Sequence, residues 1–94
     1  MVTLEIDEDR LQVDRVVFSA DHFAFVMADG RRIEAPLWWY PRLHSALAEE
    51  RENWEVLPFG DAVGWAELDE FVSAKALIVG GPAPGALPPA EAAE

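Results

Sequence analysis

The C-terminal segment of the chain limits the possible folds more than any other feature. Residues 80–94 hold four of the seven prolines and three of the six glycines, and Leu87 is their one large apolar side chain. Such a segment cannot bury enough surface to offset the entropy lost on ordering. We therefore predict a single folded domain over residues 1–79 and a disordered tail over residues 80–94.

A domain of this size needs unusual support. It buries only about 60% of its unfolded surface, which leaves its stability marginal. The chain has no cysteine, so disulfides and cysteine-ligated metals are excluded. It does have four tryptophans, five phenylalanines and one tyrosine. We expect the missing stability to come from a core built around tryptophans, or from a dimer; monomer and homodimer both stay open.

The charge is strongly one-sided. The formal net charge is −11, from 18 acidic and 7 basic side chains. Nucleic acid would be repelled, because its binding depends on lysine and arginine displacing counterions. The charge serves either solubility or an acidic face that fits a basic partner.

Two further features concern location. The first residues are acidic where a secretory signal would be basic, and no apolar run approaches the roughly 20 residues of a membrane span. We expect a cytoplasmic protein that does not cross a membrane.

Alternating apolar residues predict strands in the first half. The alternation is weak over residues 2–6 and strong in the segments that follow. Asp29-Gly30 lies between two of these segments and favours a two-residue type I′ turn. The predicted strands are residues 2–6, 13–18, 22–28 and 31–37.

The second half predicts one main helix. Pro41 suits a first helical position, and Asn53 can provide a left-handed cap, so we expect a helix over residues 41–52. The further predicted elements are a strand over residues 54–59, a short strand with Val63 and Trp65, one helical turn over residues 66–70, and a Ser73-capped helix over residues 74–79. The predicted fold is α+β, an antiparallel meander of about four to five strands packed with one main helix and a short C-terminal helix.

Two sequence patterns carry a family resemblance. Residues 36–43 read Pro-Leu-x-x-x-Pro-Arg-Leu, and residues 65–70 read Trp-x-x-Leu-Asp-Glu. With these patterns, residues 13–80 resemble a small bacterial family, domain of unknown function 2442. The resemblance implies an antiparallel sheet with one main helix. It also implies pairing like that of toxin and antitoxin, because members are commonly encoded beside another very small protein. Some members carry an added helix-turn-helix domain, and this sequence shows no such extension.

The sequence lacks the patterns of an enzyme. His22 and His44 have no second ligand at metal-binding spacing. The serines have no nucleophile-elbow context, and the glycines have no phosphate-loop spacing. We predict no catalytic residues, no cofactor and no metal.

One carboxylate cluster leaves two alternatives open. Glu67, Asp69 and Glu70 could perform acid–base work or hold a hard cation. They could instead cap backbone donors or pair with Arg42 or Arg51. We favour the structural alternative.

The candidate binding site is the segment between the third strand and the main helix. Trp38, Trp39 and Tyr40 are consecutive, and three such side chains cannot all be buried in so small a domain. Exposed aromatics beside Arg42 match the composition of binding hot spots. We predict a partner-binding corner at Trp38, Trp39, Tyr40 and Arg42. Alternatively, one tryptophan packs on the helix and the others only lie on the surface.

Our preferred functional hypothesis is a non-catalytic protein–protein interaction module, the acidic, antitoxin-like partner in a small two-protein system. The alternatives are a homodimeric structural domain, a transcription-associated regulator acting through a DNA-binding partner, and an enzyme with an undetected carboxylate site.

Overall fold

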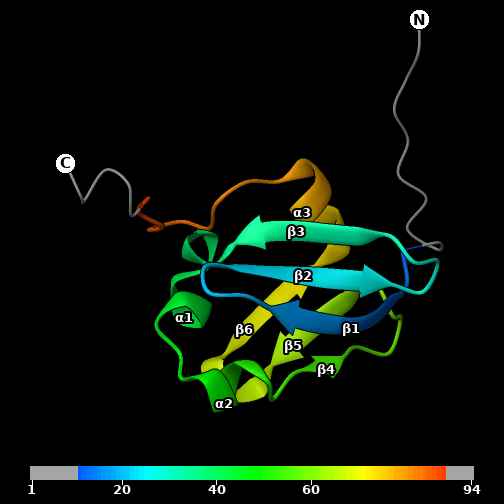
Figure 1. Cartoon of the computed structure of the whole chain (residues 1–94), viewed down its shortest axis with the longest axis horizontal. Coiled ribbons are helices and arrows are strands. Elements are labelled where there is room, and N and C mark those ends of the chain that lie inside the picture. The colour runs from blue at the N-terminus through cyan, green and yellow to red at the C-terminus, as the bar shows by residue number, and fades with distance from the viewer. Residues whose placement is uncertain (1–10, 89–94) are drawn as a thin grey trace, which may run out of the picture.

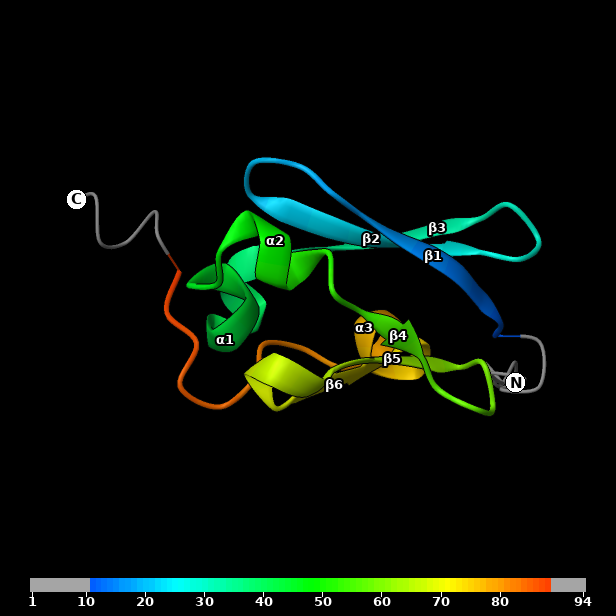
Figure 2. The same ribbon diagram turned by 90° about the horizontal axis from the view of Figure 1, so that it is seen from below.

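The computed structural model describes residues 11–88. They form two three-stranded antiparallel sheets (Figures 1 and 2). The first sheet has the order β1-β2-β3, and the second has the order β4-β5-β6. The strands are β1 (Val13–Phe18), β2 (His22–Met27), β3 (Arg32–Pro36), β4 (Glu55–Val56), β5 (Ala62–Trp65) and β6 (Glu70–Ser73). The predicted strand over residues 2–6 lies outside the described residues.

The prediction of a single meander is wrong. Figure 2 shows the two sheets as separate layers, with the connection after β3 carrying the chain from one layer to the other. β4 then pairs with β5 rather than with β3. Two opposed sheets give a small domain a core between two apolar faces, which one open sheet cannot supply without a long helix.

The long helix predicted over residues 41–52 is also wrong. That segment forms two single-turn helices, α1 (Pro41–His44) and α2 (Ala48–Arg51), after the 3₁₀ turn η2 (Leu37–Trp39). Leu47 is extended, with φ −72° and ψ 156°, and its N–H donates to Glu50 Oε1 at 2.8 Å.

Arg51 stabilises the break between the two helices. Its Nε donates to the carbonyl of Leu43 at 2.8 Å, and its Nη2 donates to the carbonyl of His44 at 2.7 Å. The side chain from α2 thus donates to two carbonyls at the C-terminal end of α1, where few backbone N–H groups are available.

Two local turn predictions need correction. In the β2–β3 turn, Gly30 has φ 95° and Asp29 does not have a positive φ, so the turn is not type I′. The carboxylate of Asp29 instead accepts from the backbone N–H and the Nε of Arg31, which favours a longer turn with glycine alone in the left-handed region. Asn53 is not left-handed either. Its side-chain amide contacts the carboxylate of Glu67.

The last part of the domain contains one strand that was not predicted. The predicted turn after Trp65 is the 3₁₀ helix η3 (Ala66–Leu68), and left-handed Asp69 leads from it into β6, a strand that the sequence did not predict. The predicted Ser73 cap is confirmed, because its Oγ accepts from the N–H of Ala76 at 3.0 Å. That cap starts α3 (Ala74–Val79).

The core lies between the sheets and is centred on aromatic rings. Trp65 is fully buried, and its indole N–H donates to the carbonyl of Arg51 at 2.8 Å. The Phe23 ring meets Phe25, Tyr40 and Trp65 at centroid distances of 5.9, 5.7 and 6.5 Å. Burying each such side chain contributes about 1.5–3 kcal/mol.

The segment after α3 is in part attached to the domain. The N–H of Ala83 donates to the carbonyl of Trp39 at 2.8 Å, and its methyl group packs against the core. The domain boundary at residue 79 stays a prediction, and residues 89–94 of the predicted tail lie outside the described residues. Within residues 11–88, no helix has the length and apolar character to cross a bilayer.

Candidate protein-binding surface

The predicted corner is split between the core and the surface. Trp38 and Trp39 are half-buried, whereas Tyr40 is 7% exposed and packs edge-on against Phe23. Burial raises the pKa of the Tyr40 phenol, and the negative charge of Glu70 raises it further. Trp39 lies against the core, and its carbonyl is occupied by Ala83. Whether this corner binds a partner stays a prediction.

Arg42 joins this corner to the carboxylate cluster. Its Nη1 donates to the carbonyl of Asp69 and lies 3.5 Å from the Asp69 carboxylate. Glu70 Oε1 accepts from the N–H of Phe71 at 3.0 Å, and Glu67 accepts from Asn53. The expected pairing of Asp69 with Arg42 and the capping by Glu70 are confirmed. Arg51 binds carbonyls rather than carboxylates.

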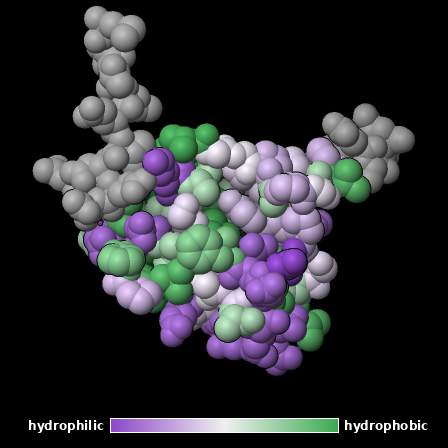
Figure 3. All heavy atoms as spheres, turned by 180° about the vertical axis from the view of Figure 1, so that it is seen from behind, coloured by the Kyte–Doolittle hydropathy of each residue, from purple (hydrophilic) through white to green (hydrophobic). Residues whose placement is uncertain are grey.

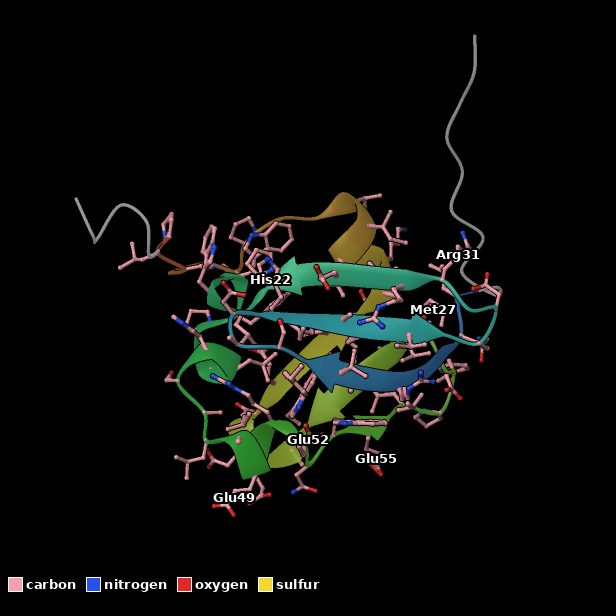
Figure 4. All side chains as sticks on the ribbon, viewed as in Figure 1. His22, Met27, Arg31, Glu49, Glu52 and Glu55 are labelled. Atoms are coloured by element: carbon pink, nitrogen blue, oxygen red, sulfur yellow. The ribbon has the colours of Figure 1, made fainter. Side chains whose placement is uncertain are left out.

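His22 lies at the other edge of the molecule from a group of three glutamates. His22 Nδ1 lies 2.8 Å from Asp21 Oδ1, and this contact lowers the pKa of Asp21. Figure 4 shows His22 at the η2 end of the first sheet, well away from Glu49, Glu52 and Glu55 at the opposite edge. Among the described residues, no three histidine or acidic side chains are grouped to hold a metal ion. That the chain is not an enzyme stays a prediction.

A groove that the sequence did not predict lies on the outer face of the second sheet. Val63 and Trp65 point into the core, so Gly64 between them faces outward, paired with Glu55 on one side and Phe71 on the other. Because Gly64 has no side chain, the sheet is hollowed there, and the groove measures about 510 Å³.

Apolar side chains form the walls of this groove. Leu57 and Trp54 are half-buried at its β4 side. Phe71 stands on β6 and is 59% exposed. Figure 3 shows this face, on the side of the molecule opposite the first sheet. Hydrophobic surface lies at its centre, and hydrophilic side chains gather toward α2. We call the hollow formed by Trp54, Leu57, Gly64 and Phe71 the outer groove.

Carboxylates surround the outer groove. Glu55, Asp69 and Glu70 line it directly. A second hollow of about 490 Å³ lies next to it and is lined by Leu47, Glu49, Glu50, Glu52, Asn53 and Glu67. Asn53 lines both hollows, so the apolar surface and the acidic surface are continuous. We call Glu49, Glu52 and Glu55, labelled in Figure 4, the acidic rim.

Comparison with known proteins places the chain in a family. Residues 13–83 match the family model described as Protein of unknown function (DUF2442). The chain belongs to this family. No curated protein matches it.

A solved structure shares the fold of this DUF2442 domain. The solution NMR structure of an uncharacterized protein from Chromobacterium violaceum aligns with a TM-score of 0.66 and 21% sequence identity, over 79% of this chain and 70% of that one. All four outer-groove residues lie inside the segment that matches the DUF2442 model.

The sequence holds one signal for the outer groove. A glycine between the two inward residues Val63 and Trp65 marks an outward strand position with no side chain, which often means that another group approaches the backbone there. The position of Phe71 became evident only with β6, which pairs with β5 over four residues.

Proposed function

We propose that this DUF2442 domain is a non-catalytic protein-binding module that docks a segment of a protein partner in the outer groove. The exposure of Phe71 beside the outward-facing, half-buried Gly64, which has no side chain of its own, carries the proposal. Covering an apolar surface contributes about 25 cal/mol per Å², and an aromatic side chain next to a concave apolar floor has the composition of a binding hot spot.

The partner is the basic member of the pair. The chain carries a net charge of −11, and carboxylates line the outer groove on both sides. Complementary charge accelerates encounter and suppresses wrong partners. This supports an antitoxin-like role for the chain as the acidic member of a small two-protein system in the cytoplasm.

The predicted corner at Trp38, Trp39, Tyr40 and Arg42 is connected to the outer groove. Arg42 holds Asp69, which lines the outer groove, so Arg42 and the groove are physically connected. Trp38 is half-buried and supplies a second contact beyond the groove. Tyr40 belongs to the core and Trp39 packs against it.

Affinity capture from an extract of the native host tests the proposal. The bait is the full chain, compared with Phe71→Ser and Gly64→Val, and the captured proteins are quantified by mass spectrometry. Phe59→Ser is the matched control, because Phe59 is 86% exposed and lies in the β4–β5 turn outside the groove. We expect the wild type and Phe59→Ser to capture the same partner in similar amounts. The amount captured by each of the two groove variants should be at least tenfold lower.

A partner that Phe71→Ser and Gly64→Val retain in full would refute the outer groove as the site. A further arm with Trp38→Ala plus Arg42→Ala tests the corner separately. Sedimentation velocity at two protein concentrations tests the homodimeric alternative. Self-association that Phe71→Ser removes would mean that a second copy, rather than a different protein, occupies the groove.

A further inference from the structure

We infer that the docked segment has two parts, an apolar anchor that sits on Gly64 and a neighbouring group of lysines or arginines that reaches the acidic rim. The inference rests on the proposed function and specifies the chemistry of the partner. Three features carry it: the shape of the groove floor, the availability of the carboxylates, and the sign of the charge on this face.

The floor of the outer groove is Gly64, which has no side chain, so a side chain of the partner can lie there. A methyl group added at Gly64 would lie 3.4 Å from Leu57 Cδ2 and 4.0 Å from the carbonyl of Glu70, which is ordinary contact distance. A partner's side chain can therefore reach the β5 backbone, with Leu57 on one side and Phe71 on the other. An aliphatic or aromatic anchor fits this floor, because the side chains of Leu57 and Phe71 on either side of it are apolar.

The carboxylates beside the groove differ in what they already bind. Glu50 accepts from the N–H of Leu47, and Glu67 accepts from Asn53, so both have structural roles. Glu49, Glu52 and Glu55 are exposed, and within residues 11–88 none of the three forms an ion pair. These three carboxylates of the acidic rim are available to a partner's cations.

The position of the acidic rim sets the order of the two parts. Glu55 pairs directly with Gly64 across the sheet, whereas Glu49 and Glu52 border the adjoining hollow on the α2 side. Asn53 lies between the two hollows. A short segment can therefore place its anchor over Gly64 and its cations toward α2.

Charge also argues against a second copy as the occupant. A symmetric dimer brings the same surface of each subunit together. On this face it would set the carboxylates of one copy against those of the other, in a chain that already carries a charge of −11. Like charges in a closing interface cost binding energy, whereas lysine and arginine on a different protein gain it.

Three synthetic peptides test the inference on the full chain. The first is acetyl-Gly-Leu-Phe-Gly-Arg-Lys-Arg-amide, and the others replace its three cations with glutamine or with glutamate. Binding is followed by two-dimensional NMR of the amide groups, with the Gly64 amide as the reporter of the groove floor. We expect the basic peptide to shift the Gly64 amide, and to bind at least tenfold more tightly at low salt than the glutamine peptide.

Matched variants assign the charge effect to residues. Glu49→Gln combined with Glu52→Gln should lower the affinity for the basic peptide at least fivefold and leave the affinity for the glutamine peptide unchanged. Glu34→Gln is the control, because Glu34 is also exposed but lies on β3 of the other sheet. We expect this control to leave the affinity for both peptides unchanged.

Two outcomes overturn the inference. The first is equal binding of the basic and glutamine peptides, with both lost in Phe71→Ser, which would leave the outer groove as a docking site without a charge requirement. The second is the absence of any shift at Gly64 with all three peptides. Neither outcome decides the proposed function, which stands or falls with the capture of a host partner.

Discussion

Tyr40 shows how the folded chain changes the chemistry of one side chain. Its ring is buried against Phe23, and its phenol is close enough to Glu70 for that carboxylate to disfavour the phenolate. Both effects favour the neutral phenol. The residue was predicted to belong to a binding corner, and in the structure its ring packs in the core.

This burial predicts an alkaline loss of stability. The unfolded chain ionises Tyr40 near the ordinary pKa of 10.0, while the folded chain ionises it only at higher pH. Above about pH 10 the unfolded state has released the proton and the folded state has kept it, so the free energy of unfolding falls as the pH rises. Below that range Tyr40 makes no contribution to the pH dependence.

The measurement is simple because Tyr40 is the one tyrosine in the chain. Phenolate absorbance is titrated in buffer and again in concentrated urea. We expect the native midpoint to lie above the urea midpoint, and coincident midpoints would contradict the burial of the phenol.

At the scale of elements, Arg51 determines how the connection between the sheets is built. Its side chain holds two carbonyls of the α1 segment, and its own carbonyl accepts from the indole of Trp65. The two single-turn helices are therefore tied both to each other and to the core. Neither helix is long enough to be stable alone.

Arg51→Lys should destabilise the domain by about 1–2 kcal/mol. A lysine ammonium can reach one of the two carbonyls but lacks the planar fork that holds both, and the acceptor left without a donor adds to the loss. Urea unfolding followed by tryptophan fluorescence measures the change. The control is Arg15→Lys, because Arg15 pairs with its neighbour Asp14 at an exposed site. We expect the free energy of unfolding of that control to stay within about 0.5 kcal/mol of the wild-type value. Equal effects of the two variants would show that Arg51 has no special role.

Local patterns predicted the first sheet well because its strands are five or six residues long and rich in apolar residues. The predicted strand over residues 13–18 has the observed bounds of β1, and the next two differ from β2 and β3 by a residue or two at their ends. In the second sheet, the predicted strand over residues 54–59 contains β4 and the predicted strand with Val63 and Trp65 is β5, but β6 was missed. β4 has two residues, and β6 exists through its pairing with β5 rather than through any pattern of its own.

The helix prediction failed for a related reason. The apolar spacing of residues 41–52 fits one helix, but the contacts of Arg51 with distant carbonyls favour a break. The outer groove was missed because it depends on β6. The pairing of Asp69 with Arg42 was one of two alternatives that the charges allowed, and only the fold, which brings residues 27 positions apart together, selects Arg42 over Arg51.

At the scale of the whole molecule, net charge opposes compactness. A charge of −11 on 94 residues makes the folded state repel itself, and the acidic rim concentrates part of this charge at one edge. A basic partner would relieve that repulsion. Dissolved salt should relieve part of it as well.

We therefore expect the free energy of unfolding to rise with salt. Between about 0.01 M and 1 M NaCl the Debye length falls from about 30 Å to about 3 Å, so repulsion between separated carboxylates is screened. Thermal unfolding across this range checks the expectation. The double variant Glu49→Gln, Glu52→Gln should show a smaller rise than the wild type, whereas a midpoint that falls with NaCl would mean that attractive ion pairs dominate.

The contact between Ala83 and Trp39 predicts where the chain can be cut. A chain ending at residue 79 loses the hydrogen bond to the Trp39 carbonyl and the packing of Ala83, which should cost about 1–2 kcal/mol. A chain ending at residue 88 should keep the full stability. Urea unfolding of both truncations decides this, and equal midpoints would place the folding limit at residue 79.

That contact has a practical consequence for anyone who builds with this domain. A fluorescent protein or purification tag fused directly after α3 would replace the segment that contains Ala83, and so would remove the hydrogen bond to the Trp39 carbonyl. A fusion joined after residue 88 keeps the Ala83 contact, and residues 84–88, which include two prolines and a glycine, then separate the domain from the fused protein. The second design is the one to use for display, labelling or crystallisation.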